Sequence, residues 1–159
     1  MYVWVWYSLK SDSLQLTDSQ STQSRTKPWN DSNWEPSSDL PALYSRDNPL
    51  RYFGWAFTLT SRMTFADRFG ISTELSSHDR AFWAWQQFLQ LIPRADRKIS
   101  MVQLNEYVPG RGTLGTCITL ASNRNEESRR RALDKAHIME IWKALEVEEE
   151  PQWFISERY

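Results

Sequence analysis

The residue types that could act as a nucleophile and a base are few in this sequence: one cysteine and two histidines. Cys117 lies in an apolar run, and His78 and His137 lie in segments with helical spacing. A Cys117–His137 pair would combine a thiol nucleophile with its general base. Cys117 is expected within a strand, however, where no helix N-terminus lowers a thiol pKa. We therefore expect no catalytic residue, and a structural or solvent-exposed role for His137.

Motifs for metals and cofactors are absent from the sequence. No His, Cys, Asp or Glu follow a metal-ligand spacing, and neither a dinucleotide-binding fingerprint nor a P-loop occurs. The single cysteine excludes an intrachain disulfide and favours a reducing compartment. The N-terminus does not resemble a signal peptide, and no stretch approaches the roughly 20 apolar residues of a membrane span. The sequence predicts no metal, no cofactor, no small-molecule substrate and no membrane association.

Tryptophan is the unusual component, with nine residues. Two of them, Trp29 and Trp34, lie in the stretch WNDSNW, where the surrounding Asn, Asp and Ser offer no apolar core. An exposed indole stacks well on a nucleobase, and such stacking is worth about 1–3 kcal/mol per base. The alternative is that both rings fold back and attach the segment to the core.

Charge is unevenly distributed along the chain. The formal net charge of -1 gives no global basic footprint for nucleic acid. Residues 51–125 nevertheless carry nine Lys or Arg against five Asp or Glu, whereas the segments before and after them are acidic. This distribution fits a focused binding face, and it equally fits a chance arrangement.

The chain divides into an N-terminal arm, residues 1–46, and a core, residues 47–159. The arm carries the Trp pair and is rich in Ser, Thr, Gln, Asp and Pro, which is typical of a segment that orders only against something else. In the core, alternation of apolar and polar residues predicts strands over 53–65, 99–108 and 113–121.

Helical spacing predicts two helices in the core. The first covers about 78–92, begins at Ser76 or Ser77 and has an apolar face of Phe82, Trp85, Leu89 and Ile92. The second runs from Asn123 or Asn125 to about Leu145. We therefore predict an α+β fold, in which a single mixed or antiparallel sheet has its helices on one face.

The other face of such a sheet would be polar. It is expected to present hydroxyls, amides and one guanidinium, with hardly any carboxylate: Thr58, Thr60, Arg62, Gln103, Asn105, Tyr107, Cys117 and Thr119. This composition suits phosphate oxygens and ribose 2′-hydroxyls. A solvated outer face is the alternative, because antiparallel sheets often have one.

Taken together, these features resemble the tombusvirus-type RNA-silencing suppressors, viral proteins that bind small-interfering RNA duplexes. The resemblance rests on the Trp pair, on Asp47-Asn48-Pro49-Leu50, on Trp55-Ala56-Phe57, and on ITLASNR at 118–124 before a helix that ends at Leu145. It covers residues 28–148 in order of elements, with identity only in patches. The family pair lies one helical turn apart, whereas Trp29 and Trp34 are five residues apart.

The resemblance implies a homodimer in the host cytoplasm that lies across short double-stranded RNA and sequesters it without catalysis. Trp29 and Trp34 would stack on the duplex ends. Arg62, Gln103, Cys117 and Thr119 would lie on or near the RNA face with Thr58, Thr60 and Asn105, and further positive charge would come from Arg51, Arg68 and Arg111.

Two other functions remain open. One is a Trp-rich module for protein–protein interaction. The other is a small enzyme or cap-like nucleotide binder that holds a methylated base between Trp29 and Trp34 through cation–π contacts.

Overall fold

The computed structural model describes residues 27, 30–31, 33–104 and 113–157. Strand β1 (Arg51–Phe57) opens the core, and two helices follow it, α1 (Leu59–Arg68) and α2 (Ser77–Gln90). After a 3-10 turn, η2 (Arg94–Asp96), come strands β2 (Ile99–Gln103) and β3 (Leu114–Ser122). The remaining elements are α3 (Glu126–Arg130), η3 (Arg131–Leu133), α4 (Lys135–Leu145) and β4 (Gln152–Ser156).

The four strands form one antiparallel sheet in the order β1-β3-β2-β4. Strand β4 also pairs with β1, so the sheet closes on itself. Tyr52 pairs with Ser122 at one end of the β1–β3 ladder, and Phe57 pairs with Thr116 at the other end. The predicted α+β class with a single antiparallel sheet is confirmed.

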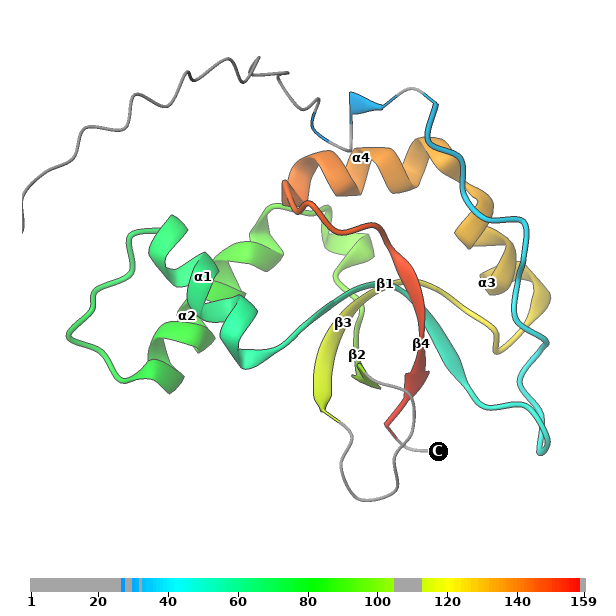
Figure 1. The fold of residues 1–159 in the computed structure, drawn as a ribbon, viewed down its shortest axis with the longest axis horizontal. Helices are drawn as coiled ribbons and strands as arrows, with labels where there is room; N and C mark the ends of the chain where they lie inside the picture. Colours follow the sequence, from blue (N-terminus) through cyan, green and yellow to red (C-terminus); the bar gives the residue numbers. More distant parts are fainter. Residues whose placement is uncertain (1–26, 28–29, 32, 105–112, 158–159) are drawn as a thin grey trace, which may run out of the picture.

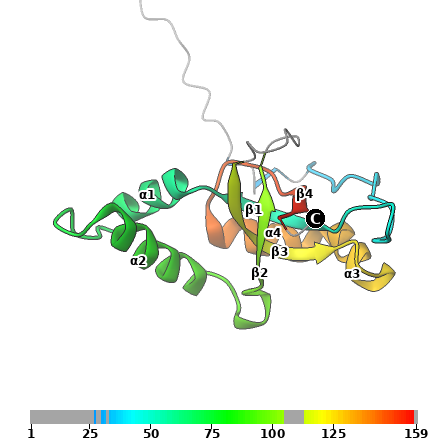
Figure 2. The ribbon, with the colours of Figure 1, turned by 90° about the horizontal axis from the view of Figure 1, so that it is seen from below.

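The helices form two groups around this sheet. Helices α1 and α2 lie side by side and extend together beyond one end of the sheet, whereas α4 runs across the sheet and α3 lies on the side away from α1 and α2 (Figures 1 and 2). Strand β4 returns from α4 to lie beside β1 (Figure 1). One continuous apolar cluster joins the sheet to both groups of helices.

Two tryptophans form the centre of this cluster. Trp55 and Trp142 are buried, and their ring centroids lie 6.2 Å apart. The Trp55 Nε1–H donates to the carbonyl of Glu149 at 2.9 Å, and the Trp142 Nε1–H donates to the carbonyl of Val147 at 2.8 Å. Each indole N–H therefore has a partner, which removes the main cost of burying tryptophan.

The predicted strand over 53–65 is wrong beyond Phe57. The Thr58 hydroxyl accepts a hydrogen bond from the Ser61 N–H at 3.1 Å, so Thr58 caps α1 and the chain turns into a helix. Phe65 then stacks on Phe88 of α2, with ring centroids 4.2 Å apart. Thr58, Thr60 and Arg62 consequently belong to α1 and its cap, and lie outside the sheet.

Helix α2 is confirmed, with Ser76 as its cap and Asp79 in its first turn. Its buried face is made by Ala81, Ala84, Trp85, Phe88 and Leu89. Phe82 was expected on this face and is instead 50% exposed. The apolar stripe is therefore rotated relative to the expectation.

The predicted long helix from Asn123 or Asn125 is interrupted. Asn125 caps the short α3, and the Asp134 side chain accepts a second capping bond from the His137 N–H at 3.1 Å, which starts α4. The segment ends at Leu145 as expected. Strand β4, which follows the acidic run, was not expected. The predicted strand 99–108 is confirmed to Gln103, and its residues from 105 onward lie outside the described part of the chain.

Candidate functional site

The two α1 arginines that were predicted to bind RNA are engaged within the protein. The Arg62 guanidinium lies over the Trp85 ring, 4.7 Å from its centroid, and donates to the Thr116 hydroxyl. Burial lowers the pKa of Arg62 from its ordinary value. Arg68 pairs with Glu146 at 2.7 Å and donates to the Leu145 carbonyl at 3.1 Å. Both cations therefore connect α1 to neighbouring elements.

The expected polar face of the sheet is wrong for strand β3. Cys117 is fully buried, and Thr119 is 8% exposed with its hydroxyl donating to the Ser100 hydroxyl at 3.0 Å. Strand β3 pairs with β1 on one side and with β2 on the other, and seven of its nine residues are buried. Gln103 is half-buried at the end of β2. Asn105 and Arg111 lie outside the described residues.

The burial of Cys117 leads to a prediction about how the free energy of unfolding depends on pH. Burial raises the pKa of its thiol to about 12, whereas the unfolded thiol ionises near about 8.5. The folded protein therefore loses stability as pH rises above the unfolded pKa, because only the unfolded chain is stabilised by ionisation. Between about pH 7.5 and 9.5 we expect this cysteine to cost about 1.4 kcal/mol of unfolding free energy. Urea unfolding at both pH values measures it.

Cys117→Ala is the control for this prediction, because every other titrating group remains. The variant should lose less unfolding free energy over the same pH interval, by about the amount assigned to the thiol. An identical pH dependence in the two proteins would contradict the prediction. Such a protonated, buried thiol is also a poor nucleophile at neutral pH.

Trp34 packs against the core. Its ring meets Trp142 edge to face, with centroids 5.4 Å apart and planes at 76°, and the side chain is half-buried. The neighbouring Glu35 pairs with Lys135 of α4 at 2.7 Å, which attaches this part of the arm to the helix. Trp29 lies outside the described residues. The end-stacking role of the two rings stays a prediction.

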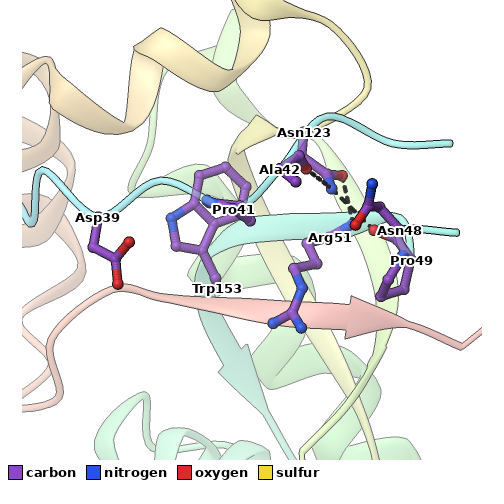
Figure 3. Close-up of a pocket in the computed structure, with 8 residues that line it drawn as sticks. All are labelled: Asp39, Pro41, Ala42, Asn48, Pro49, Arg51, Asn123 and Trp153. Carbon is purple, nitrogen blue, oxygen red and sulfur yellow. Dashed lines mark hydrogen bonds between the residues drawn. The ribbon is translucent and has the colours of Figure 1, made fainter.

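Arg51 lies beside a hollow of about 310 Å³ whose lining includes Asn123 and Trp153 (Figure 3). The Asn123 side chain donates to the carbonyls of Ala42 and Pro49 at 2.8 and 2.9 Å, and it accepts from the Arg51 N–H at 2.7 Å. The Arg51 guanidinium points away from Asn123 (Figure 3). This hollow therefore marks the junction of arm and core.

A different surface brings together cationic side chains that have no ion-pair partner in the described part of the chain. Two adjoining hollows of about 310 and 330 Å³ share Tyr52, Ser100 and Arg124, and we call them the Arg124 groove. The groove runs over the start of β1, strand β2 and the end of β3. Its lining consists of Leu50, Tyr52, Lys98, Ile99, Ser100, Met101, Thr119, Leu120, Ala121, Ser122, Arg124, Asn125, Ser128, Arg131 and Ser156.

The Arg124 groove is cationic and rich in hydroxyls. Lys98 and Arg124 are exposed and have no ion-pair partner among the described residues, while Arg131 pairs loosely with Glu127 at 3.5 Å. Among the residues that the structure describes, no Asp or Glu belongs to its lining. Hydroxyls and unpaired cations without carboxylates are the groups that bind phosphate oxygens.

Strand geometry brings the two free cations to one place. Lys98 precedes β2, and Arg124 follows β3, which runs antiparallel to β2. The Thr119 N–H donates to the Lys98 carbonyl at 2.8 Å, so Lys98 continues the pairing beyond Ile99. Asn123, which directly precedes Arg124, is itself held in place by its hydrogen bonds to the arm and to β1.

Among the described residues that were predicted for RNA binding, Thr119 alone lies in the Arg124 groove. The sequence interpretation missed Lys98 and Arg124, although a basic residue close to a strand end is a readable signal. Lys98 directly precedes β2, and Arg124 lies two residues after the end of β3. Within the run 129–131, Arg129 and Arg130 pair with Glu126 at 2.5 and 2.8 Å. The bond from Arg130, followed by the charges of both arginines, lowers the pKa of Glu126.

Comparison with protein families, curated proteins and solved structures finds no match to this chain. In the part of the chain that the structure describes, no group of three or more His, Cys, Asp or Glu is placed to hold a metal ion. Nor is any helix in that part long and apolar enough to cross a membrane.

Proposed function

We propose that the protein binds short double-stranded RNA without reading its sequence, and that it acts as a viral suppressor of RNA silencing by sequestering small-interfering RNA. The observation that carries this proposal is the Arg124 groove, in which two unpaired cations lie among hydroxyls with no carboxylate. Double-stranded RNA is recognised through its phosphates and 2′-hydroxyls, because its deep, narrow major groove excludes side chains. The resemblance to tombusvirus-type suppressors points to the same ligand.

Two kinds of group in the Arg124 groove would contact the RNA, cations and hydroxyls. Lys98 and Arg124 bind phosphates, because both are exposed and unpaired within the described chain. The hydroxyls of Tyr52 and Ser100, at the junction of the two hollows, suit 2′-hydroxyls and phosphate oxygens. This assignment replaces the α1 residues as the source of backbone contacts.

A homodimer is part of the proposal. Ile99, Met101 and Leu114 are between 44% and 47% exposed on the neighbouring strands β2 and β3. Ile99 and Met101 also line the Arg124 groove, so two copies that joined along this exposed apolar stripe would bring their grooves together toward one duplex. Trp29 remains the candidate for stacking on a duplex end.

The test is RNA affinity after removal of the two free cations. We expect Lys98→Ala with Arg124→Ala to weaken binding of a small-interfering-sized RNA duplex by about 10–100-fold, since each lost phosphate contact costs about 1 kcal/mol or more. The slope of log affinity against log salt should fall in magnitude by about 2. Fluorescence anisotropy over a salt series gives both quantities.

The matched control is Arg94→Ala with Lys143→Ala, which removes the same charge from exposed positions outside the groove. It should change affinity less than about three-fold. Equal weakening by the two pairs would mean that only overall charge matters. A long RNA duplex, single-stranded RNA and a matched DNA duplex complete the comparison. Failure of the wild-type chain to bind the short RNA duplex would overturn the proposal.

One observation favours a protein-interaction module as the second candidate. Phe82 and Trp83 on α2 are 50% and 52% exposed, and their rings meet edge to face at 5.4 Å. Adjacent exposed aromatic rings are typical of interaction hot spots. If the chain binds none of the nucleic acids, this surface becomes the stronger basis for its function.

A further inference from the structure

A third hollow, of about 470 Å³, lies at the opposite end of β1 from the Arg124 groove. We call it the Trp55 pocket. Its walls come from β1, α1, the end of β2, the connection between α4 and β4, and β4 itself. The lining residues are Trp55, Ala56, Phe57, Ser61, Thr64, Phe65, Leu104, Glu146, Val147, Glu148, Glu149, Glu150, Gln152 and Phe154.

The inner wall of the Trp55 pocket is apolar and well ordered by packing. Trp55 and Phe57 are almost fully buried, and Phe57 meets Phe65 edge to face at 5.3 Å. The Trp55 Nε1–H donates to the Glu149 carbonyl, so the indole already has its polar partner. A bound molecule would contact aromatic and aliphatic surface on this wall. The indole N–H would not be available to it as a hydrogen-bond donor.

The rim of the pocket is acidic. Glu146 is paired with Arg68. Glu148, Glu149 and Glu150 are exposed, and in the described part of the chain none of them has an ion-pair partner. No Lys or Arg from the described part of the chain lines the pocket. Three uncompensated carboxylates beside an aromatic wall attract a cation that carries an apolar stem, and they repel the phosphates of RNA.

We propose that the Trp55 pocket binds lysine or arginine side chains from a basic segment of a partner protein. The aliphatic stem of such a side chain lies along Phe57 and Phe65, and its charged head reaches the carboxylates at 148–150. The volume falls within the range of about 300–1,000 Å³ that is usual for ligand pockets, and it admits more than one side chain. This site goes beyond RNA binding and does not depend on it.

The test uses a fluorescein-labelled octapeptide that alternates lysine with leucine. We expect Glu148→Gln, Glu149→Gln and Glu150→Gln together to weaken its binding by about ten-fold, since each exposed charge contact contributes modestly. The matched control replaces Glu74, Glu140 and Glu157 by glutamine, three exposed carboxylates outside the pocket. It should weaken binding by less than about two-fold.

A second variant tests the apolar wall without changing charge. Thr64 is exposed on α1 and lines the pocket, so Thr64→Trp should fill it and weaken peptide binding by about ten-fold. RNA affinity should stay unchanged in Thr64→Trp, which separates this inference from the proposed function. Equal weakening by the two glutamine triples, full peptide binding by Thr64→Trp, or no peptide binding by the wild-type chain would each overturn the proposal.

Discussion

Replacing Gly54 by alanine is expected to lower the free energy of unfolding by more than about 4 kcal/mol. Gly54 has a φ of +154°, a conformation that residues with a Cβ rarely adopt. A Cβ built there would lie 1.8 Å from the carbonyl oxygen of Ile118 and 3.0 Å from its carbonyl carbon. Both neighbours are backbone atoms of the paired strand, so no side chain can move aside to make room.

The place of Gly54 in the β1–β3 ladder explains why its replacement should cost so much stability. The register of β1 against β3 shifts between Phe53 and Gly54, which marks an irregularity in the ladder. Trp55 follows directly and enters the core. An alanine would have to separate β1 from β3 at the shift, and would displace this buried indole with it.

Gly70→Ala is the control for the cost of a positive φ without a steric clash. Gly70 also has a positive φ, of +64°, but a Cβ added there meets nothing within 4 Å. Its replacement should cost only about 1 kcal/mol. Urea unfolding of both variants measures the difference. Similar losses at the two positions would show that conformation, and not the contact with Ile118, dominates at Gly54.

The fold class could be predicted from the sequence because the patterns that encode it are local. Alternation in 114–122 and helical spacing in 77–90 each arise from neighbouring residues. The strand over 53–65 failed at Thr58, where one hydroxyl bonded to the Ser61 N–H redirects the chain. An alternating stretch such as FTLTS suits a strand and a capped helix equally, and the packing of Phe65 on Phe88 decides between them.

The candidate site was harder to predict because its parts meet only through tertiary structure. Lys98 and Arg124 are far apart in sequence and come together through the antiparallel pairing of β2 with β3. Cys117 and Thr119 are buried because β3 lies between β1 and β2, with Ala56 and Ser100 paired to either side of Cys117. Sequence periodicity shows which residues share a face of a strand. It does not show whether that face is covered.

Asn123→Leu should destabilise the protein by about 2–4 kcal/mol, because it leaves three partly buried polar groups without their partner. Asn123 is 1% exposed, and its side chain bonds the carbonyls of Ala42 and Pro49 and the Arg51 N–H. Leucine has a similar volume, so the loss would arise from hydrogen bonding and not from a cavity. Urea unfolding followed by tryptophan fluorescence measures it.

Asn125→Ala is the matched comparison, since it removes an asparagine with one capping bond, to the Ser128 N–H at 2.8 Å. It should cost about 1 kcal/mol. Equal losses in the two variants would mean that the arm contributes little to stability.

Because Asn123 directly precedes Arg124, the leucine variant should also bind the RNA duplex more weakly under conditions where it remains folded. If its RNA affinity were unchanged while stability fell, the position of Arg124 would have to be maintained by β3 alone, and the arm would contribute to folding and not to the groove.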